Sequence, residues 1–551
     1  MKQLLQNILS VLTAKEKKAF VKGILLDILI SFLDILFLVL LLAVINFYTQ
    51  PHSVKYTTVL FTVFEKHPLW LIGIFFILFS VKNAFGFGVF RSQYQYVYAV
   101  ASRISKEKLT GYYHCPFSDY VKVDSAVTIR MISQLPIEFS HYVLRGVQQI
   151  ISQVVLIILT LIPAIIFKPV LFPILFLVLA PPVLLLGITM KKKLIRARAS
   201  VKSSGEQSLQ HLKEAIAGYV ESNVYGKNDF FIKRYHTFQA KVNQHLSRQQ
   251  ILQNLPSRFI EVFAIFGLVV LIVINAFTPG SGAVSLVTIG AFMAAAYKII
   301  PGIVKILNSS AQIKTYSYTI AALLPQNSPV LKKEKLSAIT SIGFDSVFFS
   351  YEDKNVLEGF SMRAEKGDCI GISGSSGKGK TTLINLLLGF LSPASGTISI
   401  NGTATTQGDR QQYWDKIAYV KQEHFLIHDT ILKNITLREE GQADKKLMEI
   451  TALTGVDEMV RTIPGGLHAL ISEEGKNFSG GQRQRILLAR ALYKDFDLLI
   501  LDEPFNELDE TSEIILLEHL QKIAGEGKII LLITHHATGL SFCNKKVVLD
   551  A

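Results

Sequence analysis

The sequence predicts a chain of two parts: an α-helical unit with six membrane-spanning helices, followed by an α/β unit built around a phosphate-binding loop. Two observations carry this prediction. Apolar runs long enough to span a bilayer recur in the first part, and a glycine-rich motif at residues 374–381 follows a short apolar run in the second. Only 18% of the 551 residues are charged, against about 25% in an average soluble protein. The first part is therefore predicted to lie in a membrane.

Residues 1–19 are predicted to form an amphipathic helix that lies on the membrane surface. The apolar residues that share one face of this helix are Leu4, Leu5, Ile8, Leu9 and Leu12. The apolar part is too short for a secretory signal, and no small-residue cleavage site follows it. Lysines at residues 15–22 place the N-terminus in the cytoplasm, because basic residues concentrate on that side of a membrane. A frayed tail is the alternative.

Residues 20–324 are predicted to form the transmembrane domain. Its spans are expected at residues 23–48, from 70 to beyond 90, and at 143–167, 171–190, 259–277 and 284–307. The segment between spans four and five is rich in Lys and Arg, so we place it in the cytoplasm. Because its composition favours helix, we expect both spans to continue beyond the bilayer, with a bend near residues 219–229.

The formal net charge of +14 could indicate a nucleic-acid partner. The basic residues sit largely beside the apolar spans, as expected for cytoplasmic loops that face an anionic membrane surface. We therefore expect a lipid bilayer as partner and no nucleic acid. The three cysteines, Cys115, Cys369 and Cys543, show no CxxC spacing, which argues against a disulfide framework and against a zinc site.

Charged residues also occur inside the predicted spans. Asp27 and Asp34 lie seven residues apart on span one, and Lys298 and Lys305 have the same spacing on span six. A charge at the bilayer centre costs roughly 2.5–3.5 kcal/mol, so Asp34 and Lys298 should not face lipid unpaired. Two interpretations remain open. Acid and base pair between the helices, or Lys298 turns into a cavity and holds the phosphate of a substrate.

Residues 325–340 are predicted to be a linker, and residues 341–551 a nucleotide-binding domain. The motif reads Gly374-Ser375-Ser376-Gly377-Lys378-Gly379-Lys380-Thr381 and fits G-x-x-x-x-G-K-[ST]. The loop amides are expected to surround the phosphates of ATP, with Lys380 reaching the β- and γ-phosphates and Thr381 holding Mg²⁺. Thr382 then opens a helix. A chance glycine-rich turn is the alternative for the motif alone.

A strand that ends in two acidic residues supports the nucleotide site. The apolar residues 498–501 lead into Asp502 and Glu503. Beside a phosphate loop, such a strand places Asp502 on Mg²⁺, usually through water, and leaves Glu503 to orient the attacking water. A strand that simply ends in an acidic turn is the alternative.

A second anion-binding loop opens the helix expected at residues 486–493. It contains Ser479, Gly480, Gly481 and Gln482. Exposed amides, a hydroxyl and a helix N-terminus favour an anion there. One ATP does not need two such loops. We therefore expect the second loop to close on ATP that another copy of the chain holds.

With these motifs in order, the sequence resembles the ATP-binding cassette family, specifically exporters with a six-span domain fused ahead of the ATPase domain. The resemblance covers essentially the whole chain. It implies an α/β nucleotide domain with an antiparallel β subdomain and a helical subdomain. Residues 478–482 match the family's signature motif, with Phe478 where Leu is usual.

The resemblance also implies roles for further residues. Gln422 matches the glutamine that touches Mg²⁺ and faces the membrane domain, and His535 the histidine that senses the γ-phosphate. Tyr351 matches the aromatic residue that stacks on adenine, and Asp509 the last residue of the D-loop at the ATP site.

The sequence departs from the family pattern at three places. Lys378 occupies a loop position that is normally small, so its side chain should point away from the phosphates. Asn506 and Glu507 replace the usual Ser-Ala of the D-loop. The sequence ends at Ala551, before the helix that usually follows in the family. No catalytic group is lost, since Lys380, Glu503 and His535 are all present.

The fusion of one membrane module to one ATPase module resembles a half-transporter that works as a homodimer, or together with a related half-transporter. The layout is similar to flippases of lipids and lipid-linked oligosaccharides, which implies a hydrophobic or lipid-linked anionic substrate in the cytoplasmic (inner) membrane, with the ATPase domain in the cytoplasm. A peptide or drug exporter is an alternative, and an ATP-gated channel or regulator is an alternative of another class. The six expected spans exclude a soluble DNA-repair ATPase.

Overall fold

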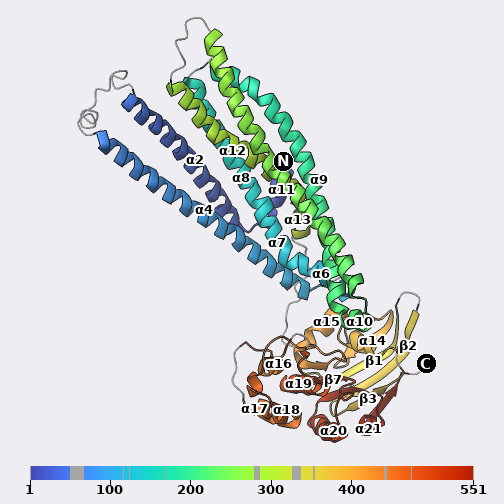
Figure 1. Ribbon diagram of the computed structural model, residues 1–551. Helices are drawn as coiled ribbons and strands as arrows, with labels where there is room; N and C mark the ends of the chain where they lie inside the picture. Colours follow the sequence, from blue (N-terminus) through green and yellow to red (C-terminus); the bar gives the residue numbers. More distant parts are fainter. Residues whose placement is uncertain are drawn as a thin grey trace. The chain divides into compact units, whose positions relative to one another are not determined.

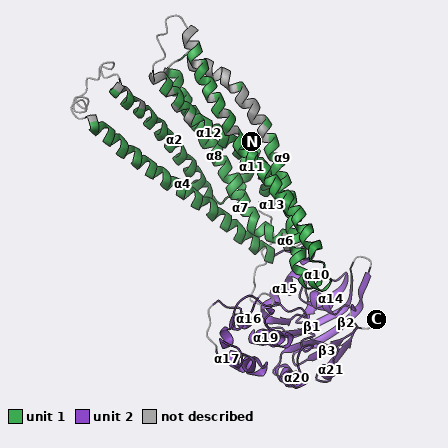
Figure 2. Cartoon of the chain, viewed as in Figure 1, with its two compact units in different colours: residues 1–113, 124–327 green, residues 114–123, 328–551 purple. Residues whose placement is uncertain are grey.

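The computed structural model describes residues 2–49, 68–115, 117–122, 125–167, 169, 171–277, 286–324, 337–351, 354–375, 377–439, 444–472 and 475–549. The chain divides into two compact units, residues 1–113 with 124–327 and residues 114–123 with 328–551 (Figure 2). Within the described residues, the first unit is entirely helical and the second carries all the strands (Figure 1). The expected linker, residues 325–340, lies outside the described residues up to position 336.

Six long helices make up most of the described first unit: α2 (Ala14–Thr49), α4 (Pro68–Tyr113), α8 (Arg145–Phe167), α9 (Leu171–Ala217), α11 (Asn228–Phe277) and α12 (Leu286–Tyr316). Shorter elements are α1 (Lys2–Val11), α6 (Ser125–Ile129), α7 (Leu135–Glu138), α10 (Tyr219–Val224) and α13 (Tyr318–Leu323). Two π-helical turns, η1 (Arg130–Gln134) and η2 (Phe139–Leu144), precede α8. Each long helix contains most of one expected span. Span three begins in η2, and residues 284–285 of span six lie outside the described residues.

Helices α9 and α11 pack against each other, and the short α10 lies between them in the chain (Figure 1). Their lengths of 47 and 50 residues exceed the roughly 20 residues that cross a bilayer. The predicted helical extension of spans four and five, and the bend near residues 219–229, are confirmed.

Helix α1 is amphipathic, but its apolar face packs on the protein. Ile8, Val11 and Leu12 are at most 7% exposed and join a core that includes Phe139 and Ile320. This face therefore contacts protein, and the position of the helix at the membrane surface stays a prediction. Periodicity alone cannot distinguish a lipid surface from a protein surface, since both accept the same apolar stripe.

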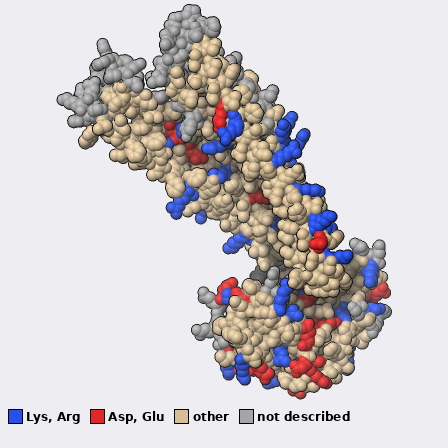
Figure 3. Space-filling model, in the orientation of Figure 1, with Lys and Arg blue, Asp and Glu red and all other residues tan. Residues whose placement is uncertain are grey.

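Three helical stretches among the described residues are long and apolar enough to cross a membrane: Ala14–Ile45, Leu69–Tyr113 and Val127–Ile166. The other three expected spans fall in α9, α11 and α12, where some side chains lie outside the described part of the chain. Figure 3 shows that most of the visible surface of the helical unit carries neither basic nor acidic side chains. Such a surface suits a lipid environment.

The second unit contains two sheets. An antiparallel sheet has the order β2-β1-β4-β5, from β1 (Ser341–Tyr351), β2 (Lys354–Glu365), β4 (Ser395–Ile400) and β5 (Thr403–Ala404). A parallel sheet has the order β6-β7-β8-β3-β9, from β3 (Cys369–Ser373), β6 (Ile417–Val420), β7 (Leu498–Asp502), β8 (Ile529–Ile533) and β9 (Lys545–Val548). Strands β7 and β8 are fully buried, as their uninterrupted apolar sequences predict.

Helices complete this unit on either side of the parallel sheet. α14 (Lys380–Leu387) belongs to the core shared with the antiparallel sheet. α19 (Gly480–Tyr493), α20 (Glu510–Gly525) and the helical subdomain belong to the second core. The helical subdomain contains α16 (Ile431–Thr436), α17 (Lys445–Leu453) and α18 (Val456–Arg461). The other short helices are α15 (Gln407–Gln412), η3 (Tyr413–Lys416), η4 (Gly466–His468) and α21 (Ala537–Ser541). The predicted fold, with an antiparallel β subdomain and a helical subdomain, is confirmed.

A short segment from the loop between α4 and α6 belongs to the second unit. Its helix α5 (Phe117–Lys122) places the Phe117 ring 4.8 Å from the ring of Phe390. Phe390 in turn lies 5.2 Å from the ring of Trp414. Aromatic pairs at these distances contribute roughly 0.5–1.5 kcal/mol beyond the area that they bury.

Two of the three cysteines are neighbours in space. The Sγ atoms of Cys369, on β3, and Cys543 lie 3.6 Å apart, and both side chains are buried as free thiols. The wide sequence spacing of these cysteines gave no sign of this contact. Parallel strand pairing between β3 and β9 brings the two positions together.

Candidate nucleotide site

The phosphate-binding loop joins the buried strand β3 to the helix α14, as the motif requires. Gly377 and Gly379 have φ angles of +82° and +93°, which residues with a side chain rarely adopt. A Cβ at Gly379 would also lie only 2.8 Å from Val356 Cγ1. Gly379 is the N-cap of α14, so the exposed amides at the start of this helix lie at the loop. The loop can therefore accept an anion.

The structure places the other loop residues around this point. Thr381 is exposed, whereas Thr382 is buried. Ser375 is exposed, Gly374 lies beside Leu549, and Ser376 lies outside the described residues. Of these two neighbouring threonines, Thr381 is thus the exposed one.

The Lys380 side chain folds back over the phosphate-binding loop. It is buried, and its Nζ donates a hydrogen bond to Gly374 O at 2.7 Å. The same Nζ contacts His535 Nε2 and is 3.9 Å from Glu503 Oε1. A cation held at this place by a main-chain carbonyl and a carboxylate is ready to bind phosphate oxygens.

Glu503 is the centre of the polar network. Its Oε2 accepts hydrogen bonds from Gln422 Nε2 at 2.7 Å and from Asn506 Nδ2 at 3.0 Å. Its Oε1 lies 3.2 Å from His535 Nε2. Glu503 also has a φ of +52°, and backbone strain of this kind clusters at functional sites. Residues from four separate segments, Lys380, Gln422, Glu503 and His535, therefore meet at one point.

Asp502 lies beside this network at the end of β7. Burial, and then the charge of Glu503, raise the pKa of Asp502 to about 6, although Lys380 acts in the opposite direction. Two adjacent carboxylates, one of them buried, favour a bound cation, because the cation would remove the cost of ionising both. Together with the exposed hydroxyl of Thr381, this pair fits Mg²⁺, which takes oxygen ligands.

The second anion-binding loop lies at the start of α19. Ser479 is the N-cap, and its Oγ accepts a hydrogen bond from the amide of Gln482 at 3.3 Å. Gln482 Oε1 accepts a hydrogen bond from the amide of Ser479 at 2.9 Å. This capping box already uses the Ser479 hydroxyl and the Gln482 amide, two groups that were expected to bind an anion. The amides of Gly480 and Gly481 also lie at this helix start, where the Glu507 carboxylate lies beside Gly480.

Asp509 and Tyr351 lie apart from the central network. Asp509 is the N-cap of α20 and accepts a hydrogen bond from Arg485 at 2.8 Å. Tyr351 ends β1 and is 48% exposed, with its ring 4.9 Å from the ring of Phe349, and an exposed aromatic side chain can stack on a base. Sequence reasoning missed the bond from Asn506 to Glu503. The sequence shows that Asn506 replaces the usual Ser, but the turn after β7 determines that its side chain reaches Glu503.

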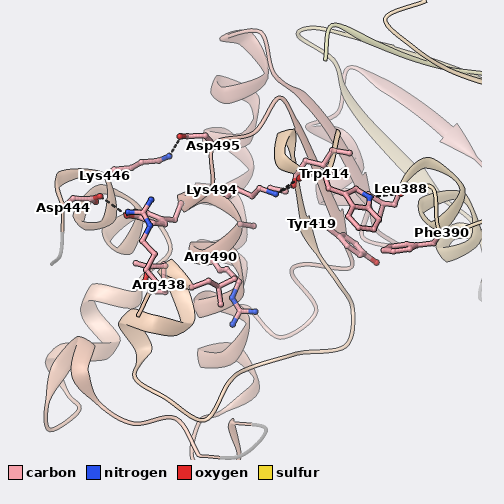
Figure 4. A pocket seen from close by; sticks show the side chains of 17 residues that line it. Leu388, Phe390, Trp414, Tyr419, Arg438, Asp444, Lys446, Arg490, Lys494 and Asp495 are labelled. Carbon is pink, nitrogen blue, oxygen red and sulfur yellow. Dashed lines mark hydrogen bonds and ion pairs between the residues drawn. The ribbon is translucent and has the colours of Figure 1, made fainter. Parts of the chain in front are cut away.

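A pocket of about 700 Å³ lies elsewhere in the same unit (Figure 4). Its wall is aromatic and apolar, with Phe390, Trp414 and Tyr419 on one side. Charged residues of both signs also line it: Arg438, Lys446, Arg490 and Lys494 with Asp444 and Asp495, and Lys446 pairs with Asp495. None of the predicted nucleotide residues lines it, so it is a separate surface feature. No short motif in the sequence marked it.

A family model described as "ABC transporter" matches residues 357–506. Residues 357–506 thus carry the sequence pattern of an ABC transporter ATPase domain. The match includes the phosphate loop, Gln422, the signature motif and Glu503.

Relatives named as ABC transporters and flippases match longer stretches. The chain is 28% identical over 348 residues to an "ATP-dependent lipid A-core flippase" from Burkholderia thailandensis, covering 62% of this chain and 58% of the relative. It is 28% identical over 378 residues to "Glutathione/L-cysteine transport system ATP-binding/permease protein CydD" from Bacillus subtilis, covering 67% of this chain and 64% of the relative. A "Probable ABC transporter ATP-binding/permease protein" from Haemophilus influenzae is 30% identical over 226 residues, 41% of either chain. The chain thus spans about two-fifths to two-thirds of these relatives.

The whole chain has the fold of an ABC exporter. A solved structure titled "Structure of a bacterial Atm1-family ABC exporter with ATP bound" superposes with a TM-score of 0.77, covering 98% of this chain and 94% of that one. At 16% sequence identity, this likeness concerns the fold. Among the described residues, three helical stretches of this fold are long and apolar enough to cross a membrane.

Proposed function

We propose that this chain is an ATP-driven exporter or flippase in which two copies share two ATP sites. The convergence of Lys380, Gln422 and His535 on Glu503, in a chain fused to a helical membrane unit, carries the proposal. The ABC transporter family and the exporter fold support it.

Each residue of the site then has a defined task. Lys380 and the loop amides bind the β- and γ-phosphates. Thr381 and Asp502 hold Mg²⁺, with Gln422 beside them, and the cation supplies positive charge against the phosphate oxygens. Glu503 orients water and accepts its proton, and His535 holds Glu503 from the other side. The exposed Tyr351 ring stacks on adenine.

The raised pKa of Asp502 predicts a pH dependence of Mg²⁺ binding. Below about pH 6 the Asp502 carboxyl holds a proton, and the metal must displace it. We expect Mg²⁺-dependent nucleotide affinity to be steady above pH 7 and to fall by up to about tenfold per unit as the pH drops below 6. Magnesium titrations with a fluorescent nucleotide between pH 5 and 8 measure this. D502N is the control and should lose most of this dependence. Constant affinity down to pH 5 in the wild type would contradict the assignment.

Exposed apolar side chains support a second copy as partner. On and beside α10, Tyr219, Val220, Val224 and Tyr225 are 63–74% exposed. They follow the basic segment of α9, so they lie outside the membrane. Such a patch marks a protein contact. We propose the aromatic and apolar wall of the pocket in Figure 4 as the surface that this patch contacts on a second copy.

The substrate is proposed to be a lipid or lipid-linked molecule with an anionic group. Asp34 on α2 pairs with two lysines, Lys82 on α4 and Lys298 on α12, with 2.8 Å between Lys298 Nζ and Asp34 Oδ2. The expected pairing of acid and base between helices is therefore present, and Lys82 was not foreseen. Two ammonium groups share one carboxylate, so the cluster keeps one excess positive charge among membrane helices. An anionic substrate group would neutralise it.

The other charges of these spans are placed differently. Asp27 accepts hydrogen bonds from Gln93 at 2.7 Å and from Gln148 at 3.1 Å. Lys305, one heptad beyond Lys298 on α12, is exposed. Neither residue alters the charge balance at Asp34.

Single lysine variants test the substrate site. K298Q leaves a matched Asp34–Lys82 pair, so we expect near-normal folding but loss of most ATPase stimulation by anionic lipid. D34N leaves two unpaired lysines and should unfold at lower temperature, because each charge costs roughly 2.5–3.5 kcal/mol in the bilayer. Thermal unfolding and lipid-stimulated ATPase activity measure both effects, with K305Q as the control. Full stimulation in K298Q, or unfolding as severe as in D34N, would contradict the substrate role.

The transport proposal has its own test. The purified protein in liposomes should move a fluorescent anionic phospholipid across the bilayer in one direction when ATP is present. This movement should run against the concentration gradient of the phospholipid. Movement that runs only down a gradient would favour an ATP-gated channel, the alternative of another class. Retention of Glu503 favours the pump, because a gate can dispense with fast hydrolysis. We place the protein in the cytoplasmic membrane, with the N-terminus and ATPase domain in the cytoplasm.

A further inference from the structure

We propose that Glu507 of one copy forms an ion pair with Lys378 of a second copy when the shared ATP sites close. The two residues are opposite in charge, and both depart from the pattern of the family that the sequence resembles. The inference rests on the proposed sharing of ATP between two copies and adds a recognition contact to it.

Glu507 lies directly on the second anion-binding loop. Its carboxylate occupies the place that a Cβ at Gly480 would take, and its carbonyl oxygen lies 2.7 Å from the place of a Cβ at Gly481. These two glycines therefore leave room for residue 507. The Glu507 side chain is otherwise exposed. Any surface that meets the start of α19 also meets this carboxylate.

The segment that carries Glu507 is fixed to α19 on both sides. Gln484 Nε2 donates to Pro504 O at 2.6 Å. Arg485 donates to Asp509 Oδ1 at 2.8 Å and to Ser512 Oγ at 2.9 Å. Because α19 holds the segment before and after residue 507, the carboxylate moves together with the second loop.

Lys378 lies on the outer side of the first loop. Its side chain is exposed, whereas Lys380, two residues later, is buried and faces Gly374 O. Gly377 and Gly379, on either side of Lys378, have positive φ angles, and this backbone conformation places the two lysines in different environments. The Lys378 side chain is thus exposed on the loop that a covering partner would meet.

Closure of a shared site brings these two surfaces together. The second loop of one copy then covers phosphates held by the first loop of the other, so Glu507 arrives at the rim that carries Lys378. An uncompensated carboxylate so close to a triphosphate would be repelled. The Lys378 ammonium removes this repulsion, so one contact explains both departures. It also favours two copies of this chain over a mixed pair in which one residue lacks its partner.

A double-mutant cycle with neutral variants tests the pair in the full-length protein in liposomes. We expect K378Q and E507Q each to raise the ATP concentration for half-maximal hydrolysis about two- to fivefold. The double variant K378Q/E507Q should be no worse than the poorer single variant, since both remove the same contact. E510Q, a charge-matched change of an exposed residue three positions later, should behave as the wild type.

Charge reversal gives an independent readout. K378E and E507K should each lose activity by about tenfold or more, and the swapped variant K378E/E507K should recover most of it, whereas K378E/E510K should not. Additive losses in the neutral cycle, together with no recovery in the swap, would overturn the ion pair. The complementation experiment in the Discussion separates this failure from that of the shared sites. If complementation succeeds while the cycle is additive, the sites are shared but Lys378 and Glu507 do not pair.

Discussion

The E503Q variant should bind ATP normally but hydrolyse it at least about a hundredfold more slowly, and should accumulate as a closed dimer. A positioned general base contributes about 10²- to 10⁴-fold to a rate, and an amide cannot accept the proton. Binding survives because Gln has the shape of Glu. Its amide oxygen can still accept the hydrogen bonds that Glu503 Oε2 accepts from Gln422 and Asn506.

Retained radioactive nucleotide and single-turnover hydrolysis measure these two properties. E510Q carries the same change of charge outside the network and should turn over at the wild-type rate. The ratio of bound nucleotide to turnover should therefore rise sharply in E503Q alone. Turnover in E503Q within about tenfold of the wild type would show that Glu503 is not the base.

The features that local sequence patterns specify were predictable. The phosphate loop, its glycines with positive φ and the acidic end of β7 each depend on a few consecutive residues, so their geometry follows from the motif. The long helices followed from apolar length and helix-forming composition in the same way. The meeting of Gln422, Glu503 and His535 needed the sheet order as well, and the family resemblance supplied it.

Contacts between distant segments were not predictable from this one sequence. Lys82 lies 48 residues from Asp34, and nothing in its surroundings marks it as a partner. The burial of α1 and the docking of Phe117 on Phe390 also depend on tertiary packing. Glu507 was visible as a departure, but its place over Gly480 follows from the anchoring of its segment to α19. In each case the tertiary fold determines which residues meet, so the local sequence pattern cannot predict the contact.

Two inactive variants of this chain should restore activity when mixed, if ATP sites form only between copies. K380A removes the cation that binds the phosphates in the first loop. S479R removes the N-cap of α19 and places a bulky side chain at the second loop. Each variant alone should retain less than about 1% of wild-type ATPase activity, since every site contains a damaged part.

A mixed dimer contains one site in which both defects meet and one in which neither occurs. Random pairing makes half of the dimers mixed, so we expect the mixture to recover about a quarter of the wild-type activity, provided that one intact site turns over independently. Co-expression with two affinity tags isolates the mixed dimers, in which recovery should approach half. K380A mixed with K380A/S479R is the control and should recover nothing, because every site then lacks Lys380. Inactive mixed dimers that nevertheless bind ATP more tightly than S479R alone would show that hydrolysis needs two intact sites. Mixed dimers that hydrolyse ATP no faster than their parents and bind it no more tightly than S479R alone would refute the shared-site arrangement.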